Sequence, residues 1–255
     1  MSPIFYKKLG NGPAIILLHG FPMNHEVWEE WARPLSSTFT VYTPDLPGFG
    51  QSASLPDGFT IAQIATRMLV WMDELQLDKA VVIGHSMGGY VALNMVKQRA
   101  SSFQALVLFH STAMADNPEK KESRTKVVRF IEDNGVVAFT SNFIAPLYAD
   151  QAHPSIPFVR GITMKSNASA VKGYTVAMRD REDTTEVLRD FENPVLIIAG
   201  EKDPGIPVKT ITDQARLGTH IQAVVLDDTG HMGMFERPEE TLTLVKTFIF
   251  NISVR

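Results

Sequence analysis

The chain has 255 residues, of which 44% are hydrophobic and 20% charged, and its formal net charge is −4. This composition is typical of a globular protein with a substantial core. Lysine and arginine are scattered, the densest pair being Lys120-Lys121, so a nucleic-acid-binding surface is disfavoured. The absence of cysteine excludes disulfides, thiolate metal sites and a cysteine nucleophile.

The N-terminal residues lack the apolar core of a secretory signal. The longest apolar stretch near them, residues 14–18, is too short to cross a bilayer. We therefore expect a cytoplasmic protein without membrane contact.

Short apolar runs rich in Val, Ile and Leu recur along the chain, with helical patterns between them. Continuous runs of this kind are typical of strands buried on both faces of a parallel sheet. The predicted strands are 4–8, 14–18, 40–43, 80–83, 105–109, 195–199 and 222–226, and the predicted helices are 61–75, 87–99, 208–217 and 239–249. The alternation predicts an α/β fold with a mostly parallel sheet flanked by helices.

The sequence Gly84-His85-Ser86-Met87-Gly88 lies where a predicted strand stops and a helix starts. A serine on such a sharp turn is held clear of the backbone, and flanking glycines remove side chains that would clash there. The backbone N–H of Met87 would lie in the first turn of the helix, where an oxyanion can be stabilised. An isolated pattern could be an ordinary turn, but the strand-turn-helix setting favours a nucleophile.

The interval 112–191 interrupts the alternation, because it contains several amphipathic helix patterns and no convincing strand. Its first helix is predicted to begin at Asn117-Pro118, a capping residue followed by proline at the first helical position. Asn134-Gly135 is a favourable stop for that helix. We expect an all-helical cap, or lid, of residues 112–191 inserted in a core of residues 1–111 and 192–255.

A serine nucleophile requires a base and a group that orients the base. His231 is the best of seven histidines, because it lies in a glycine-flanked loop after the last predicted strand. Asp203 follows the preceding strand and comes before a proline, which favours a fixed loop. Both would lie at the carboxyl edge of the sheet, as would Ser86. Glu201, Asp227 and Asp228 are rivals for the acid.

Four other residues in these loops are better explained by structure than by chemistry. Asp45 begins a Pro-Gly turn, where aspartate commonly accepts hydrogen bonds from the backbone. His19 and His85 are expected to pack and to form hydrogen bonds around the serine turn. For His110, at the end of strand 105–109, a packed, hydrogen-bonded histidine is favoured over a substrate contact.

The chain resembles the α/β-hydrolase family over nearly its whole length. The matching segments are His19-Gly20-Phe21-Pro22, Asp45-Leu46-Pro47-Gly48-Phe49-Gly50-Gln51-Ser52, Gly84 to Gly88, Gly200-Glu201-Lys202-Asp203 and Gly230-His231. Their order, serine then acid then histidine, is the one that the family uses. The short N-terminal portion departs from the family, since it offers one strand before residues 14–18.

The resemblance implies the α/β-hydrolase fold, with the helical insertion as a cap over the substrate pocket. It also implies that Ser86 is the nucleophile, Asp203 the acid and His231 the base, with the N–H groups of Phe21 and Met87 as the oxyanion hole. Such a site needs no metal and no organic cofactor.

A serine at this turn favours acyl transfer, because relatives of haloalkane dehalogenases and epoxide hydrolases carry aspartate there. Apolar stripes in the cap predict an apolar pocket, so a small, largely apolar carboxylic ester is the favoured substrate. The stripes include Phe130, Phe139, Phe143, Phe158, Met164, Tyr174 and Met178. Basic and acidic side chains in the cap nearly balance, which disfavours docking of an acyl carrier protein.

The same constellation leaves several alternatives open. Carbon-carbon bond hydrolases, lactonases, cofactor-free perhydrolases and aminopeptidases that resemble proline iminopeptidase use it too. A non-enzymatic alternative is a small-molecule receptor on the same fold.

Overall fold

A seven-stranded sheet forms the centre of the protein, which a computed structural model describes from residue 3 to residue 253. The strands are β1 (Tyr6–Leu9), β2 (Ala14–Leu18), β3 (Thr40–Pro44), β4 (Ala80–His85), β5 (Phe103–Phe109), β6 (Val195–Gly200) and β7 (Ile221–Leu226). They lie in the order β1-β3-β2-β4-β5-β6-β7. β1 pairs antiparallel with β3 at one edge, and the other pairings are parallel. The predicted mostly parallel sheet is confirmed.

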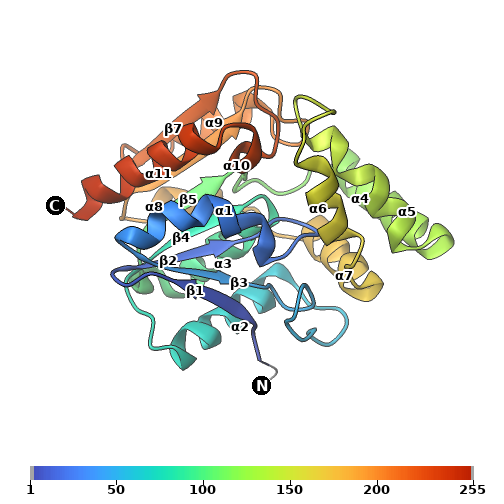
Figure 1. Ribbon diagram of the computed structural model, residues 1–255, viewed down its shortest axis with the longest axis horizontal. Coiled ribbons are helices and arrows are strands. Elements are labelled where there is room, and N and C mark those ends of the chain that lie inside the picture. Colours follow the sequence, from blue (N-terminus) through green and yellow to red (C-terminus); the bar gives the residue numbers. More distant parts are fainter. Residues whose placement is uncertain (1–2, 254–255) are drawn as a thin grey trace.

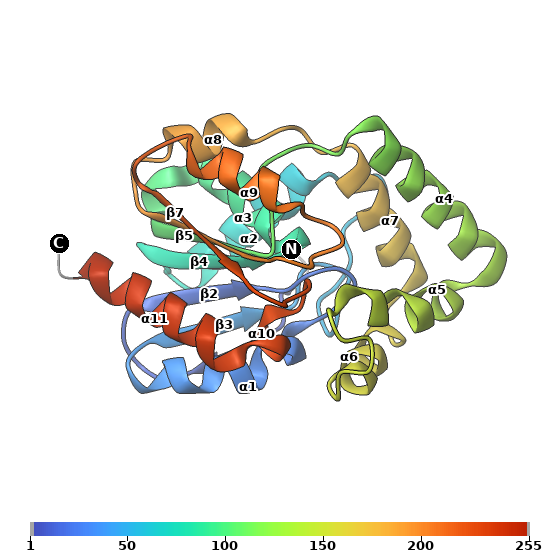
Figure 2. The same cartoon turned by 90° about the horizontal axis from the view of Figure 1, so that it is seen from above.

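Helices cover both faces of the sheet (Figure 2). Helices α2 (Ile61–Glu74), α3 (Met87–Arg99), α8 (Thr185–Asp190) and α9 (Val208–Ala215) cover one face, and α1 (Glu29–Ala32) and α11 (Pro238–Ser253) cover the other. Successive side chains of a strand point to opposite faces. Ile16 and Leu18 of β2 therefore belong to one buried apolar cluster, and Ile15 and Leu17 to the other.

The helix boundaries follow from local capping. Thr60 and Gln63 form a reciprocal capping box at the start of α2. The side chain of Asn117 accepts a hydrogen bond from the backbone N–H of Lys120, and Pro118 occupies the first turn of α4 (Pro118–Asn134). Gly135 then ends that helix with φ of 83°. The first helix of the insertion thus begins and ends where the sequence predicts.

The chain between β5 and β6 is helical, and most of it lies beyond one end of the sheet. Figure 1 shows α4, α5 (Val136–Phe143), α6 (Ile156–Thr163) and α7 (Ala168–Arg179) gathered there. α8, the last helix of the interval, contacts α3 over the sheet instead. No helix within residues 3–253 has both the length and the apolar character needed to cross a bilayer.

Candidate active site

Ser86 lies on a strained turn between β4 and α3. Its φ of 51° and ψ of −116° are unusual for a residue with a side chain. A Cβ atom on Gly84 would lie 2.4 Å from the carbonyl oxygen of Gly88, and one on Gly88 would lie 2.4 Å from that of Leu18. The backbones are packed too closely here for any side chain, which explains the glycine spacing around Ser86.

Asp203 and His231 come together at the carboxyl ends of β6 and β7. The Nδ1 atom of His231 is 2.7 Å from Oδ2 of Asp203. The other carboxylate oxygen accepts hydrogen bonds from the backbone N–H groups of Gly205 (2.8 Å) and Ile206 (3.1 Å). An ionised carboxylate is an acceptor only, so Nδ1 of His231 is the donor and its Nε2 is left as an acceptor.

The environment of Asp203 keeps its carboxylate ionised. Burial acts to raise its pKa, but attraction to His231 and the contacts with His110 and His231 outweigh burial and hold the pKa well below its usual range. A negative charge therefore lies beside His231 at neutral pH, where it can stabilise a proton gained by the imidazole.

His110 is fully buried beside Asp203 and approaches the same carboxylate oxygen as His231. Its backbone has φ of 47°, and its Nδ1 atom lies 3.5 Å from Oδ2 of Asp203. That separation is longer than an ordinary hydrogen bond. Burial is the main cause that lowers the pKa of His110, which favours the neutral ring. His110 is thus packed beside the carboxylate, as the sequence predicts. The expected hydrogen bond is not found, because neither ring nitrogen has a hydrogen-bond partner among the described residues.

Two further histidines and Asp45 hold the surrounding loops. Nε2 of His85 is 2.9 Å from the carbonyl oxygen of His231, and burial is the first cause that keeps the pKa of His85 well below its usual value. Nε2 of His19 accepts from the backbone N–H of Leu46 (2.9 Å). Asp45 accepts from the backbone N–H groups of His25 and Gln51, both at 2.8 Å. These contacts are structural, as the sequence predicts.

Glu236 is a contributor to the site that the sequence did not reveal. Its carboxylate accepts hydrogen bonds from the backbone N–H groups of Gly230 and Met232, on either side of His231, at 3.0 Å. It also accepts from that of Ala149 (2.8 Å) in the insertion. Glu236 thereby fixes the histidine loop and ties it to the insertion, although no motif marks it.

Ser86 and His231 line the same cavity, of about 290 Å³. Phe21, from the loop after β2, lines it as well. Of the apolar residues expected to form the pocket, Phe143 and Met178 do so. Phe130, Phe158 and Met164 are instead among the exposed large hydrophobic residues. The cavity also receives Lys120 and Arg124 of α4, which the sequence did not indicate.

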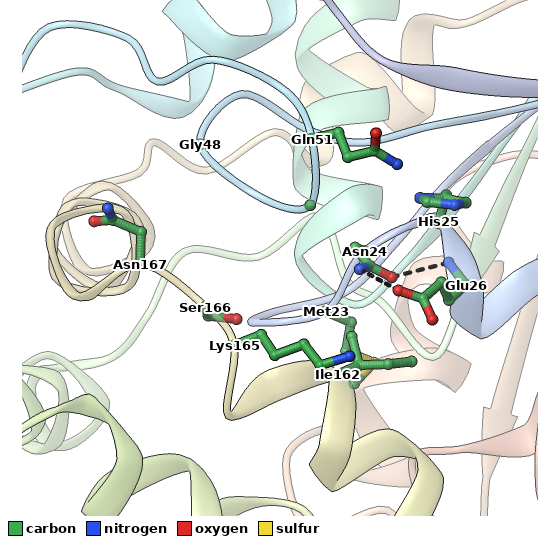
Figure 3. A pocket seen from close by; sticks show the side chains of 11 residues that line it. Met23, Asn24, His25, Glu26, Gly48, Gln51, Ile162, Lys165, Ser166 and Asn167 are labelled. Atoms are coloured by element: carbon green, nitrogen blue, oxygen red, sulfur yellow. Dashed lines mark hydrogen bonds between the residues drawn. The ribbon is translucent and has the colours of Figure 1, made fainter.

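A second cavity, of about 250 Å³, lies where the loop after β2 meets the segment between α6 and α7. Figure 3 shows Asn24 hydrogen-bonded to Glu26, with Lys165 and Ser166 opposite them. The hydroxyl of Ser166 donates to the carbonyl oxygen of Pro22 (2.8 Å). Polar contacts at this cavity therefore join the insertion to the loop that carries Phe21.

One group of residues could in principle hold a metal ion. His110, Asp203 and His231 each offer a ligand atom, and these atoms lie within 4.8 Å of one another. An ion between them would compete with the 2.7 Å contact between His231 and Asp203. The group is therefore better explained as a carboxylate that orients a histidine.

Comparisons with known proteins bear on the family and the fold. The model of the alpha/beta hydrolase family matches residues 15–244. Over 247 residues the chain is 29% identical to 3-oxoadipate enol-lactonase 1 of Acinetobacter baylyi, covering 95% of this chain and 90% of that protein. It is 27% identical to pimeloyl-[acyl-carrier protein] methyl ester esterase of Vibrio parahaemolyticus, covering 96% and 97%. A thermophilic esterase from Thermogutta terrifontis, solved with malate bound, superposes with a TM-score of 0.92 at 28% identity, covering 98% of this chain and 93% of the other.

Proposed function

The chain belongs to the alpha/beta hydrolase family and has its fold, and on that premise we propose that it is a serine hydrolase of small carboxylic esters. The family membership and fold expected from the sequence are confirmed by these comparisons. One observation carries the proposal. The hydrogen bond from His231 to Asp203 orients an imidazole in the cavity that Ser86 also lines.

In the proposed reaction His231 is the base and Ser86 the nucleophile. Nε2 of His231 takes the hydroxyl proton, and Oγ of Ser86 attacks the ester carbonyl carbon. The carbon–oxygen bond to the alcohol then breaks, the alcohol receives the proton from His231, and the acyl group stays on Ser86. Water, deprotonated by His231, releases the acid and restores the serine. Asp203 stabilises the imidazolium in both steps.

We assign the oxyanion hole to the backbone N–H groups of Phe21 and Met87. Met87 is the first residue of α3, where backbone N–H groups lack partners within the helix and the helix dipole is positive. Phe21 approaches from the loop after β2 and lines the cavity beside Ser86. Two fixed donors of this kind stabilise the negative charge that develops during acyl transfer.

We assign the role of cap to residues 112–191, with 1–111 and 192–255 as the core. α4, α5 and α7 contribute Arg124, Phe143 and Met178 to the wall of the cavity, which supports this division. α8 would then anchor the end of the cap on α3.

Replacing the nucleophile tests the proposal. Ser86→Ala should lower kcat on a short aryl ester by about a millionfold if the three residues act as a unit. Ser169→Ala is the matched control, because Ser169 is exposed on α7 and does not line the cavity. Ser123 does line the cavity, so its hydroxyl is the alternative target for labelling. Mass spectrometry after fluorophosphonate treatment should place the adduct on Ser86. Labelling of Ser123, or retained activity in Ser86→Ala, would refute the assignment.

A lactonase is the second candidate, supported by the 29% identity to an enol-lactonase. The same attack opens a lactone, but the leaving alcohol stays attached to the acyl group. Comparing kcat/KM on a lactone and on an open-chain ester of equal carbon number distinguishes the two. A receptor would instead stall as a covalent adduct or show no turnover on either.

A further inference from the structure

One face of α4 brings polar and charged side chains to the cavity that holds Ser86. Lys120, Ser123, Arg124 and Val127 are spaced three, four and seven residues from the first, so they share a helix face. All four line the cavity. The part of the cavity wall that α4 supplies thus has cationic and hydrogen-bonding side chains over one helical turn and an apolar side chain at the next.

The cations at this wall outnumber the anions paired with them. Arg124 and Arg181 share one carboxylate, that of the buried Asp116, and the contact from Arg181 is 2.8 Å. Arg181 also donates to the carbonyl oxygens of Met178 and Met114, at 2.7 Å each. Lys120 donates to a neutral acceptor, the carbonyl oxygen of Gly205. Two arginines therefore share one carboxylate, and the ammonium of Lys120 is bonded to a neutral group.

Arg181 and Arg124 differ in how many of their N–H donors already have hydrogen-bond partners. The guanidinium of Arg181 lies 4.0 Å from the ring centroid of Tyr90 and is enclosed by its two carbonyl partners. Arg124 contacts Asp116 through Nε, and it lines the cavity. A guanidinium has five N–H donors. Arg124 can therefore donate from its terminal nitrogens to a ligand while Nε stays on Asp116.

The charges around Lys120 favour binding of an anion near its ammonium group. Partial burial is the largest cause that lowers the pKa of Lys120, and repulsion from Arg124 and Arg181 lowers it further. Asp116 and Asp203 act in the opposite direction, but Asp203 is already hydrogen-bonded to His231. An anion bound at this wall would relieve the repulsion and stabilise the charged ammonium.

We propose that Lys120, Arg124 and Ser123 form a subsite for a carboxylate carried by the substrate. The preferred substrate is then a half-ester of a small dicarboxylic acid or a similar carboxylate-bearing ester. The ammonium, the guanidinium and the hydroxyl bind the free carboxylate, while Ser86 attacks the ester carbonyl. This inference rests on the serine-hydrolase function proposed above, and it changes the expected largely apolar substrate into an amphipathic one.

Matched esters test the subsite. Monomethyl glutarate and dimethyl glutarate differ in one negative charge, and we expect wild-type kcat/KM to favour the monoanion. Lys120→Gln should reduce the ratio of the two kcat/KM values by about tenfold or more, the usual size for a hydrogen bond to a charged group. Lys120→Arg should restore most of the ratio. Lys121→Gln is the control, because Lys121 is exposed on α4 and does not line the cavity, and it should leave the ratio unchanged.

A binding measurement separates this inference from the proposed function. Calorimetry with Ser86→Ala should detect glutarate binding, weakened about tenfold by adding Lys120→Gln and unaffected by adding Lys121→Gln. Hydrolysis of both esters without preference for the monoanion overturns the subsite and leaves the hydrolase standing. Glutarate binding without hydrolysis of either ester overturns the hydrolase and leaves the subsite. Absence of glutarate binding, or tighter binding of inorganic phosphate than of glutarate, overturns the subsite.

Discussion

The serine turn and helix α4 face the same cavity but constrain their residues to very different degrees. At the turn, Ser86 has a positive φ. A Cβ atom added to either flanking glycine would lie only 2.4 Å from a backbone oxygen. On α4, Ile131 is buried, whereas Ser123 is exposed and Lys120 is only partly buried. Substitutions of the flanking glycines must therefore disturb the backbone, while those on α4 change one side chain in place. The type of reaction and the choice of substrate can therefore vary independently.

Among the variants that test this comparison, the largest loss of kcat is expected from replacing Asp203, the proposed acid at the end of β6. Asp203→Asn should lower kcat by about 10,000-fold, because an amide cannot stabilise the imidazolium and favours the wrong tautomer of His231. Asp228→Asn is the matched control, since Asp228 is fully exposed and pairs with Lys202. Steady-state kinetics on one ester would show the difference. Equal losses of kcat in Asp203→Asn and Asp228→Asn would show that Asp203 is not the acid that orients His231.

A pair of glycine substitutions compares the serine turn with another helix of the insertion, α6. Gly88→Ala should destabilise the fold by about 3 kcal/mol, because its Cβ would meet the backbone at Leu18. Gly161→Ala on α6 meets nothing within 4 Å and should stabilise the helix by about 0.5–1 kcal/mol. Urea unfolding of both variants measures the free energy of unfolding, which should fall for Gly88→Ala and rise for Gly161→Ala. A tolerated Gly88→Ala would show that the turn is less constrained than its packing indicates.

The acid sensitivity of the core is expected to be smaller than the effect of Gly88→Ala. Burial lowers the pKa of His19 to about 4, against about 6.5 in the unfolded chain. The unfolded state therefore binds more protons between these values, so stability is present above pH 6.5 and is lost as the pH falls toward 4. At pH 5 His19 alone should cost about 2 kcal/mol. Urea unfolding at pH 7 and pH 5 checks this, and equal stabilities would contradict it.

Much of the fold and of the candidate site could be predicted from local sequence. Continuous apolar runs predict the strands because both faces of a parallel sheet are buried. The glycine spacing around Ser86 predicts the sharp turn because the steric requirement is local. His231 and Asp203 could be named because loops after parallel strands meet at one edge of the sheet. In the structure, Nδ1 of His231 lies 2.7 Å from Oδ2 of Asp203, as expected for side chains that share this edge of the sheet.

Other parts of the site depend on contacts between distant segments. Glu236 bonds to the histidine loop and to Ala149, which is 87 residues away. Apolar stripes in the insertion predict helices, but a stripe does not tell which partner covers it. Phe143 therefore lines the cavity, whereas Phe158 is exposed.

By itself, the sequence determined the alternation of strands and helices, the turn at Ser86 and the candidates Asp203 and His231, because each depends on neighbouring residues or on strand order. Tertiary structure alone decided that Lys120 and Arg124 line the cavity of Ser86 and that Asp116 is shared by two arginines. The physical reason is that charge balance in a cavity depends on which helices enclose it. In a sequence where basic and acidic residues nearly cancel, that local excess of positive charge is invisible until the chain folds.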